Sequence, residues 1–274
     1  MTARRLLAEV AGYGSVAVAY SGGADSALVL AAAVRALGAE RVLAVTAVSE
    51  SLAAAELAPA AAFAESLGVR HRTPRTNELA SAGYRANGRD RCYFCKSTVL
   101  TAITATAAEE GVATVATGTN ADDAVDPFRP GIRAGDERGV RTPLRDAGLT
   151  KEAVRAISRE WSLPTAEKPA TPCLASRVRY GLTITPYRLA RVDRAETAVR
   201  AVLSDAGVHT TDLRVRDLET AVRVEIDAHL TARPLPALGV ALTESGFTDV
   251  PVEIAPFRSG NLNRTPPVGD SGLS

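Results

Sequence analysis

Short apolar runs alternate with alanine-rich stretches along the first half of the chain. The run SVAVAY (15–20) is continuous and ends at glycines, which is typical of a buried strand in a parallel sheet. The pattern predicts four strands, at 15–20, 41–49, 69–76 and 112–118, separated by three helices, at 25–38, 53–68 and 97–111. This alternation predicts an α/β fold in which a parallel sheet carries helices on both faces, with right-handed crossovers.

The pattern changes after residue 120. Residues 120–143 are polar and rich in glycine and proline, which predicts a long loop, and 149–164 predicts an amphipathic helix closed by proline. A long helix, two short segments that can pair, another helix and a last strand are then predicted at 185–207, 212–227, 234–246 and 249–256. We therefore expect a first domain at 1–165, a smaller α+β substrate and oligomerisation domain at 166–257, and a disordered tail at 258–274.

Composition narrows the class of protein. Of the 274 residues, 46% are hydrophobic and 23% are charged, which is the balance of an ordinary globular protein. A net charge of +1 gives no reason to expect nucleic acid as a partner. No apolar run reaches the ~20 residues of a membrane span, and the start of the chain does not resemble a signal peptide. Three cysteines, a small and odd number, favour a reducing cytoplasm, where thiols serve metals or catalysis.

The segment YSGGADS (20–26) stands where the first predicted strand meets the first helix. Its glycines let the backbone approach an anion, its serines offer hydroxyls, and the helix presents unpaired amides and the positive end of its dipole. The lysine of a Walker A loop and the spacing of GxGxxG are both missing. A tight strand-to-helix turn with a serine cap is the structural alternative.

This segment resembles the PP-loop of ATP pyrophosphatases, which cleave ATP between the α and β phosphates. The resemblance implies an ATP-binding loop made of Ser21, Gly22, Gly23, Asp25 and Ser26. Asp25 is also expected to help hold Mg²⁺, because hard cations prefer carboxylate oxygens. Such enzymes activate a carboxylate or carbonyl oxygen as an adenylate, since AMP is a far better leaving group than hydroxide.

A second polar segment, GTNADD (118–123), follows the fourth predicted strand. It lies at the carboxyl edge of the sheet, where open α/β folds bind their ligands. We expect Gly118, Asp122 and Asp123 to contact nucleotide or magnesium, with capping of the loop as the alternative for the two aspartates. The chain has no glutaminase domain, which disfavours ammonia as the nucleophile that displaces AMP.

The cysteines allow three interpretations. Cys92 and Cys95 form a CxxC in RCYFCK, and Cys173 lies far downstream in KPATPCLASR. Free cysteines can pack as small hydrophobes. A structural zinc site needs four ligands, but there is no second CxxC and the three histidines show no paired spacing. A three-cysteine iron–sulfur cluster would leave one iron without a protein ligand, where an extra sulfide can bind.

An ordered series of motifs resembles LarE, a family of ATP-dependent sulfur transferases that build the nickel-pincer nucleotide cofactor of lactate racemase. The motifs are YSGGADS, RCYFCK, GTNADD, FRPG (128–131), PLRDAGLTKEAVR (143–155) and KPATPCLASRVRYGLTIT (168–185). The resemblance implies a PP-loop fold of the adenine nucleotide alpha hydrolase type. It also implies a small-molecule nucleotide substrate, pyridinium-3,5-biscarboxylic acid mononucleotide, whose carboxylates are adenylated and then receive sulfur.

The resemblance also implies roles for the cysteines. Some LarE proteins carry only the cysteine of the CLASR motif and sacrifice its sulfur, so that it becomes dehydroalanine. Others also carry the CxxC pair and are thought to bind a [4Fe–4S] cluster. Because the pair is present here, the resemblance implies the cluster type, with Cys92, Cys95 and Cys173 as ligands and Cys173 at the catalytic position.

Further roles are expected in the second domain. Arg177 is expected to meet a substrate carboxylate or phosphate, with loop anchoring through an ion pair as the alternative. Arg214 and Arg216 share one side of a predicted strand and resemble the family's arginines for the substrate phosphate. Glu196 and Glu225 are expected to be ordinary surface carboxylates, with a metal or substrate site as the alternative. The resemblance further implies a homo-oligomer, with trimeric symmetry.

Two other functions remain open at this stage. A tRNA-thiolating PP-loop enzyme can also use three cysteines and a cluster, but the near-neutral charge and the lack of an RNA-binding appendage disfavour it. A protein that binds nucleotide or an iron–sulfur cluster without turnover is the alternative from a different class.

Overall fold

The computed structural model describes residues 2–125, 130–232 and 236–258. The chain divides into two compact units, and each is described here by itself. The first unit comprises 1–49, 54–81 and 89–171, and the second comprises 50–53, 82–88 and 172–274. The predicted domain boundary lies at 165/166, whereas the units change over at 171/172 and two short segments of the first half belong to the second unit.

The first unit is built on a parallel sheet, as the alternating pattern predicted. Its strands are β1 (Val16–Ala19), β2 (Val42–Val45), β3 (Arg70–Arg72) and β4 (Val115–Ala116). They pair in parallel in the order β3-β2-β1-β4. The strands are shorter than predicted, because the apolar runs continue past the residues that pair with a neighbour.

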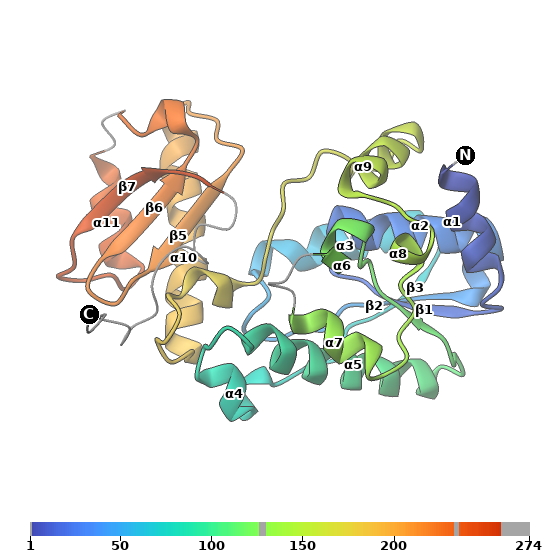
Figure 1. Cartoon of the computed structure of the whole chain (residues 1–274). Helices are drawn as coiled ribbons and strands as arrows, with labels where there is room; N and C mark the ends of the chain where they lie inside the picture. The colour runs from blue at the N-terminus through green and yellow to red at the C-terminus, as the bar shows by residue number, and fades with distance from the viewer. Residues whose placement is uncertain (1, 126–129, 233–235, 259–274) are drawn as a thin grey trace. The chain divides into compact units, whose positions relative to one another are not determined.

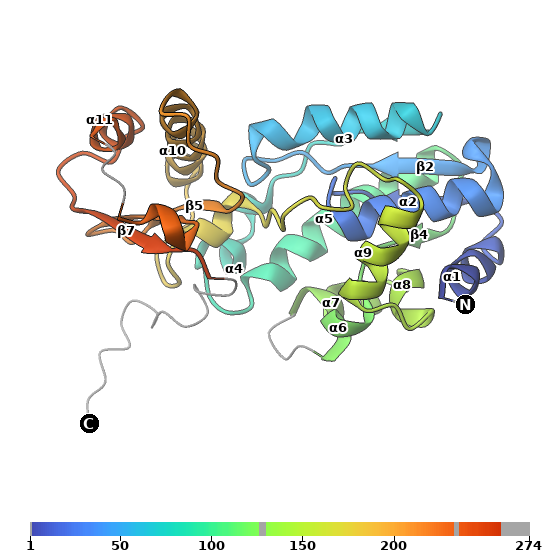
Figure 2. The ribbon, with the colours of Figure 1, turned by 90° about the horizontal axis from the view of Figure 1, so that it is seen from above.

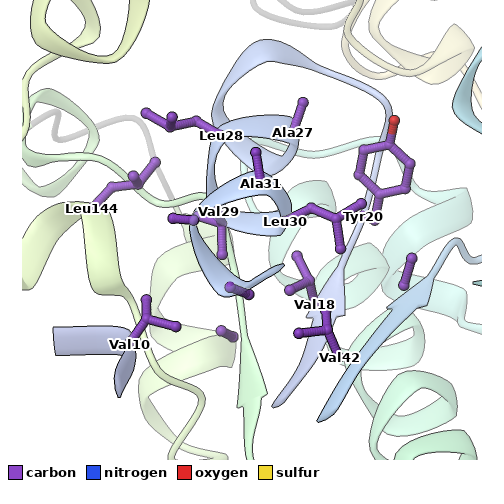
Figure 3. Packing of buried hydrophobic residues seen from close by; sticks show 14 of the residues in the cluster. Val10, Val18, Tyr20, Ala27, Leu28, Val29, Leu30, Ala31, Val42 and Leu144 are labelled. Carbon is purple, nitrogen blue, oxygen red and sulfur yellow. The ribbon is translucent and has the colours of Figure 1, made fainter. Parts of the chain in front are cut away.

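Helices cover both faces of this sheet (Figure 1). The α-helices of the unit are α1 (Thr2–Ala11), α2 (Ala24–Leu37), α3 (Ala54–Ser66), α5 (Arg91–Glu109), α6 (Ala121–Val125), α7 (Pro130–Asp136), α8 (Pro143–Asp146) and α9 (Lys151–Glu160), with 3-10 turns η1 (Ala39–Arg41) and η2 (Glu78–Ala80). Val16 and Val18 pack into a cluster with α1, α2, α3 and α9, part of which is shown in Figure 3. Ala17 and Ala19 face the other way, toward α5.

The predicted loop at 120–143 was wrong in its described parts, because α6 and α7 lie within it. α6 begins where the Asn120 side chain accepts a hydrogen bond from the amide of Asp123. α7 packs against α5 through Gly131, where an added Cβ would come within 3.3 Å of the carbonyl oxygen of Cys92. Helices this short do not complete an amphipathic period, so polar composition hid them. Most of FRPG, at 126–129, lies outside the described residues.

The second unit holds a small mixed sheet, which confirms the predicted α+β character of this part of the chain. Its elements are α4 (Ala82–Arg85), the 3-10 turns η3 (Leu174–Arg177) and η4 (Ala228–Leu230), α10 (Pro186–Asp205), α11 (Ala237–Glu244), β5 (Leu213–Asp217), β6 (Val222–Ile226) and β7 (Val252–Pro256). β6 pairs with β5 antiparallel and with β7 parallel. Figure 2 shows α10 and α11 side by side along one face of this sheet.

The two faces of the small sheet differ in chemistry. Leu213, Val215 and Val224 are fully buried on one face. Arg214 and Arg216 point to the opposite face, since side chains alternate along a strand, and Glu225 lies opposite Arg214 in the pairing register. This face is therefore both buried and charged, which is uncommon unless the charges are paired.

No helix in the described part of the chain combines the length and the apolar character needed to cross a membrane. The tail that was predicted to be disordered lies almost wholly beyond residue 258, outside the described residues.

Candidate active site

The strand order places two motifs next to each other. β1 lies between β2 and β4, so the chain leaves β1 toward one side of the sheet and later returns to its other side at β4. Ligands of open α/β sheets bind beyond the carboxyl ends of the strands at such a reversal. Segment 20–26 follows β1 and segment 117–123 follows β4, so both begin at this point.

Contacts tie the two segments together. A Cβ on Gly118 would lie 2.7 Å from the amide nitrogen of Ser26 and 2.9 Å from the carbonyl carbon of Asp25, so only glycine fits there. The Asn120 amide group donates to Oδ1 of Asp25 at 3.2 Å. The predicted pairing of these two motifs at one edge is therefore present in the structure.

The loop after β1 is held open by its own hydrogen bonds. Gly22 has φ +72°, a conformation that favours glycine. The Ser26 hydroxyl donates to the carbonyl of Gly23 at 3.1 Å and accepts from the Ser21 amide and hydroxyl at 3.2 and 3.1 Å. Within the described residues, the amides of the first turn of α2 have no acceptor. They are available to an anion, and the helix dipole favours one there.

Asp25 carries a strained charge. Burial raises the pKa of its carboxyl group, and the negative charge of Asp123 adds to this, while the hydrogen bond from Asn120 acts in the opposite direction. A divalent cation between such carboxylates would remove the cost of holding them ionised. The geometry is suited to magnesium, although the metal itself stays a prediction.

The two aspartates of GTNADD differ in their contacts. Oδ2 of Asp122 accepts the backbone amide of Lys151 at 2.7 Å, so this side chain caps the start of α9, as the structural alternative held. Asp123 caps α6 and acts electrostatically on Asp25. Asp123 is thus better placed than Asp122 to share a cation with the loop, and the nucleotide contact expected of Asp122 stays a prediction.

Lys168 was not assigned a role from the sequence, although it opens the motif KPATPC. Its Nζ donates to the carbonyl oxygen of Gly22 at 2.9 Å and to Oε2 of Glu56 at 2.6 Å. The contact with Gly22 joins residues 146 positions apart, and no local pattern announces it. The lysine before a proline was the only signal available.

Tyr20 closes the strand below the loop. Its ring packs against Phe63 and His71, and Figure 3 shows the hydroxyl pointing away from the apolar cluster. Within the described residues this buried hydroxyl has no hydrogen-bond partner. Burial, together with the charge of Glu56, raises the pKa of Tyr20 to about 12, so the hydroxyl stays protonated and available as a donor.

The CxxC pair lies on a helix rather than in the loop where its polar neighbours suggested it. α5 begins at Arg91, six residues before the helix predicted from 97. Cys92 and Cys95 therefore lie one turn apart on the same side of its N-terminal end, the first exposed and the second partly buried. Burial lowers the pKa of the neighbouring Lys96, and the charge of Cys95 acts in the opposite direction.

Cys173 belongs to the second unit. It stands immediately before η3, partly buried, with a free thiol like the other two. Its carbonyl oxygen accepts the amide and the hydroxyl of Ser176 at 2.9 and 2.7 Å and Nη1 of Arg177 at 3.2 Å. The main chain, and not the sulfur, therefore fixes this residue in place.

The three-cysteine ligand set stays a prediction. The thiols of Cys92 and Cys95 belong to the first unit and that of Cys173 to the second. Across the ranges that the structure describes, no group of three or more Cys, His, Asp or Glu side chains is close enough to hold a metal ion. The donor type fits a cluster nevertheless, because all three thiols are free and a CxxC turn presents two of them together.

Arg177 is fully buried and occupied by the protein. Its Nε and Nη2 donate to the two carboxylate oxygens of Glu196 at 2.8 and 3.2 Å, and Nη1 donates to the carbonyl of Pro172. These contacts are the loop anchoring that was kept as the alternative role. The substrate contact expected of Arg177 stays a prediction.

Arg216 and Arg214 differ in their surroundings. Arg216 donates twice to Oε2 of Glu225, at 3.0 and 2.7 Å, and once to the carbonyl of Ser176 at 2.8 Å. Arg214 lies 5.3 Å from the ring centre of Phe257, and burial, followed by the charge of Arg177, lowers its pKa to about 10. The guanidinium of Arg214 is thus the cation of this face that an anion would relieve most.

The expectation that Glu196 and Glu225 are surface carboxylates was wrong. They are 8% and 0% exposed, and each is paired with an arginine. Glu196 also accepts the amide of Val215 on the edge strand β5 at 3.1 Å. The five buried side chains comprise three arginines and two glutamates. This set carries one more positive than negative charge, which suits a phosphate group.

Comparison with known proteins first defines the class. A family model for NAD synthase matches residues 5–98, the part that contains β1, the phosphate loop and the CxxC turn. Together with the parallel sheet and the loop geometry, this match assigns the first unit to the PP-loop α/β proteins.

More extensive matches define the family. The chain is 40% identical over 199 residues to an uncharacterized protein of Synechocystis, covering 71% of this chain and 72% of the relative. It is 33% identical over 253 residues to the pyridinium-3,5-bisthiocarboxylic acid mononucleotide synthase of Lactiplantibacillus plantarum, covering 91% of this chain and 89% of that enzyme. The chain therefore belongs to the LarE family, as its motifs predicted.

Proposed function

We propose that this chain is an ATP-dependent sulfur transferase that acts on pyridinium-3,5-biscarboxylic acid mononucleotide. It would adenylate a carboxylate of this substrate and replace AMP with sulfur, a step in making the nickel-pincer nucleotide cofactor of lactate racemase. The observation that carries the proposal is the match of 253 residues with the Lactiplantibacillus synthase, because it is longer than either unit alone. The geometry of each unit supports one half of the reaction.

The first unit supports the adenylation half. The unpaired amides of the first turn of α2 and the serine hydroxyls would bind the phosphates of ATP. Asp25 and Asp123 would hold Mg²⁺, which neutralises phosphate charge. A carboxylate oxygen of the substrate attacks the α-phosphorus, the bond from that phosphorus to the β-bridging oxygen breaks, and pyrophosphate leaves. The acyl adenylate that remains is open to attack by sulfur.

The second unit supports recognition of the mononucleotide. A phosphate monoester carries up to two negative charges, and the buried arginine and glutamate set has one positive charge in excess. Arg214 would make the phosphate contact, since burial and its neighbours disfavour its charge while the site is free of anion. Arg216 and Arg177 would hold the segment that carries Cys173.

The cysteines support the sulfur-delivery half. Cys92, Cys95 and Cys173 have the donor type that a [4Fe–4S] cluster needs. When bound by three cysteines, such a cluster supplies an iron without a protein ligand, where an additional sulfide can bind. Without the cluster, Cys173 would give up its own sulfur and become dehydroalanine.

Turnover tests this proposal most directly. Protein purified under anaerobic conditions and reconstituted with iron and sulfide is mixed with MgATP and the biscarboxylate mononucleotide, and AMP, pyrophosphate and thiocarboxylate are quantified by mass spectrometry. We expect all three products, and a loss of about 10²–10³-fold in Asp25→Asn, in line with the removal of a charge-stabilising group. Thiocarboxylate formation at an undiminished rate in Asp25→Asn would contradict the role given to the loop.

Metal analysis separates the two sulfur sources. About four irons per chain, lost when any one cysteine is changed to alanine, would support the cluster. Conversion of Cys173 to dehydroalanine during a single turnover, without iron, would support sacrifice. Thiolation of transfer RNA, or nucleotide binding without product, would favour the two alternative functions. A homo-oligomer in a reducing cytoplasm completes the proposal, and mass measurement in solution tests the former.

A further inference from the structure

Lys168 is mounted rigidly beside the phosphate loop. Arg155 on α9 donates to the backbone carbonyls of Ala166 and Lys168, the latter at 2.6 Å, and the amide of Lys168 donates to the carbonyl of Thr165 at 3.2 Å. The backbone of this segment is therefore fastened to a helix of the same unit. A side chain that starts from a fixed backbone loses less conformational entropy when it binds.

The ammonium group of Lys168 has one donor to spare. It makes one hydrogen bond to the carbonyl of Gly22 and one to Oε2 of Glu56, while an ammonium carries three N–H groups. No acceptor for the third is found among the described residues. The side chain is 21% exposed, so the remaining N–H is open to a ligand and yet partly shielded from water.

Position makes a phosphate the fitting acceptor. A Cβ on Gly22 would lie 3.7 Å from Nζ of Lys168, so the ammonium lies against the first glycine of the loop. Among the described residues, no other lysine or arginine hydrogen-bonds to residues 20–26. The loop also lacks the lysine that Walker A loops carry. Lys168 thus supplies, from a distant part of the chain, the cation that the loop itself does not contain.

We propose that Lys168 is a pyrophosphate-binding residue of the loop, which donates its third N–H to the phosphates of ATP and then to the leaving pyrophosphate. Glu56 and the carbonyl of Gly22 hold the ammonium in position for this contact. The inference rests on the proposed use of ATP and deepens it, because it names the group that neutralises the leaving charge.

Binding of MgATP and of inorganic pyrophosphate, measured by calorimetry on the full chain, tests the inference. Lys168→Gln is expected to weaken both about tenfold or more, whereas Lys168→Arg keeps the charge and recovers part of the pyrophosphate affinity. The KM for ATP should rise more than kcat falls in Lys168→Gln. Arg159→Gln is the matched control, because its ion pair with Glu167 is exposed and lies one residue from Lys168.

The outcomes separate two kinds of failure. If the wild-type chain binds neither MgATP nor pyrophosphate, the proposed function fails together with this inference. If the wild-type chain binds both and a folded Lys168→Gln binds them equally well, only the inference is overturned.

A second measurement covers the case in which Lys168→Gln does not fold. The wild-type chain is acetylated with a lysine-selective reagent with and without pyrophosphate, and the modified peptides are quantified by mass spectrometry. We expect pyrophosphate to slow acetylation of Lys168 at least threefold and to leave Lys96 unaffected. Equal acetylation of Lys168 in both conditions would overturn the inference.

Discussion

The phosphate loop of the first unit and the buried charges of the second unit solve opposite problems. At the loop, the backbone amides of the first turn of α2 and one N–H of Lys168 have no acceptor within the described chain. In the second unit, the guanidinium groups of Arg177 and Arg216 are committed to glutamates and to backbone carbonyls. The loop is thus built to receive charge, whereas most of the arginine set is built to hold its own chain.

The difference also determines what a substitution does. A loop with spare donors can lose affinity without losing stability, because its groups contribute to the fold only through a few hydrogen bonds. A buried ion pair that loses one partner leaves an uncompensated charge in a medium of low polarity. The following predictions test this contrast, from the largest expected effect to the smallest.

Removal of the Arg177 guanidinium should have the largest effect on stability. Arg177→Ala would leave Glu196 buried beside the unpaired carbonyls of the Cys173 segment. We expect a loss of about 3–5 kcal/mol in the free energy of unfolding, the usual cost of breaking a buried pair. Urea unfolding followed by circular dichroism measures it.

Arg223→Gln is the matched control for that variant. Its pair with Glu253 lies on the same sheet but is exposed, with side chains 28% and 45% accessible. We expect a change below about 1 kcal/mol, as for other surface pairs. Equal losses in the two variants would show that burial does not distinguish the two pairs, and the contrast between the units would fail.

Substitution of Gly118 should affect ligand binding more than folding. In Gly118→Ala the new methyl group meets the backbone of Ser26 at 2.7 Å, so the two segments of the ATP site must separate. We expect about tenfold weaker binding of MgATP and a loss of about 1–3 kcal/mol in stability from overpacking. Gly239→Ala, on α11 with nothing within 4 Å, is expected to leave binding unchanged and to be neutral or slightly stabilising.

The smallest expected effect concerns the pH dependence of stability. The folded pKa of Asp25 is raised above its ordinary value of 3.8, so the protonated carboxyl group is favoured by folding. Its contribution is present below pH 3.8 and is lost as the pH rises through the folded pKa. Asp25→Asn should therefore be more stable than the wild-type chain at pH 7, and the advantage should vanish near pH 3.5.

Thermal unfolding at the two pH values, without nucleotide or magnesium, measures this difference. A variant that is less stable than the wild-type chain at pH 7 would mean that hydrogen bonding to Asn120 outweighs the desolvation of Asp25. The carboxylate would then belong to the fold as much as to the site.

The sequence predicted those parts of the molecule that depend on neighbouring residues. β1, α2 and the loop between them are a continuous pattern, and the predicted pairing of 212–227 appears as β5 and β6. The LarE family was recognised from contiguous motifs and then shown by a match across most of the chain.

What the sequence did not reveal depends on contacts between distant residues. Glu196 and Glu225 look like surface carboxylates until Arg177 and Arg216 are placed beside them. Lys168 reaches the loop only because Arg155 fastens its backbone to α9. The start of α5 at Arg91 was missed because RCYFCK lacks an apolar face of its own and takes its helical form within the packed unit.

The attachment of Cys173 through its carbonyl oxygen has a consequence for the life of the protein in a cell. Ser176 and Arg177 hold that oxygen whatever atom the side chain carries, so a copy that lacks the thiol should fold as well as an intact one. Such a copy would pass the chaperones and proteases that remove unstable chains. It would persist as an inactive competitor for substrate, and its accumulation would have to be limited by something other than protein quality control.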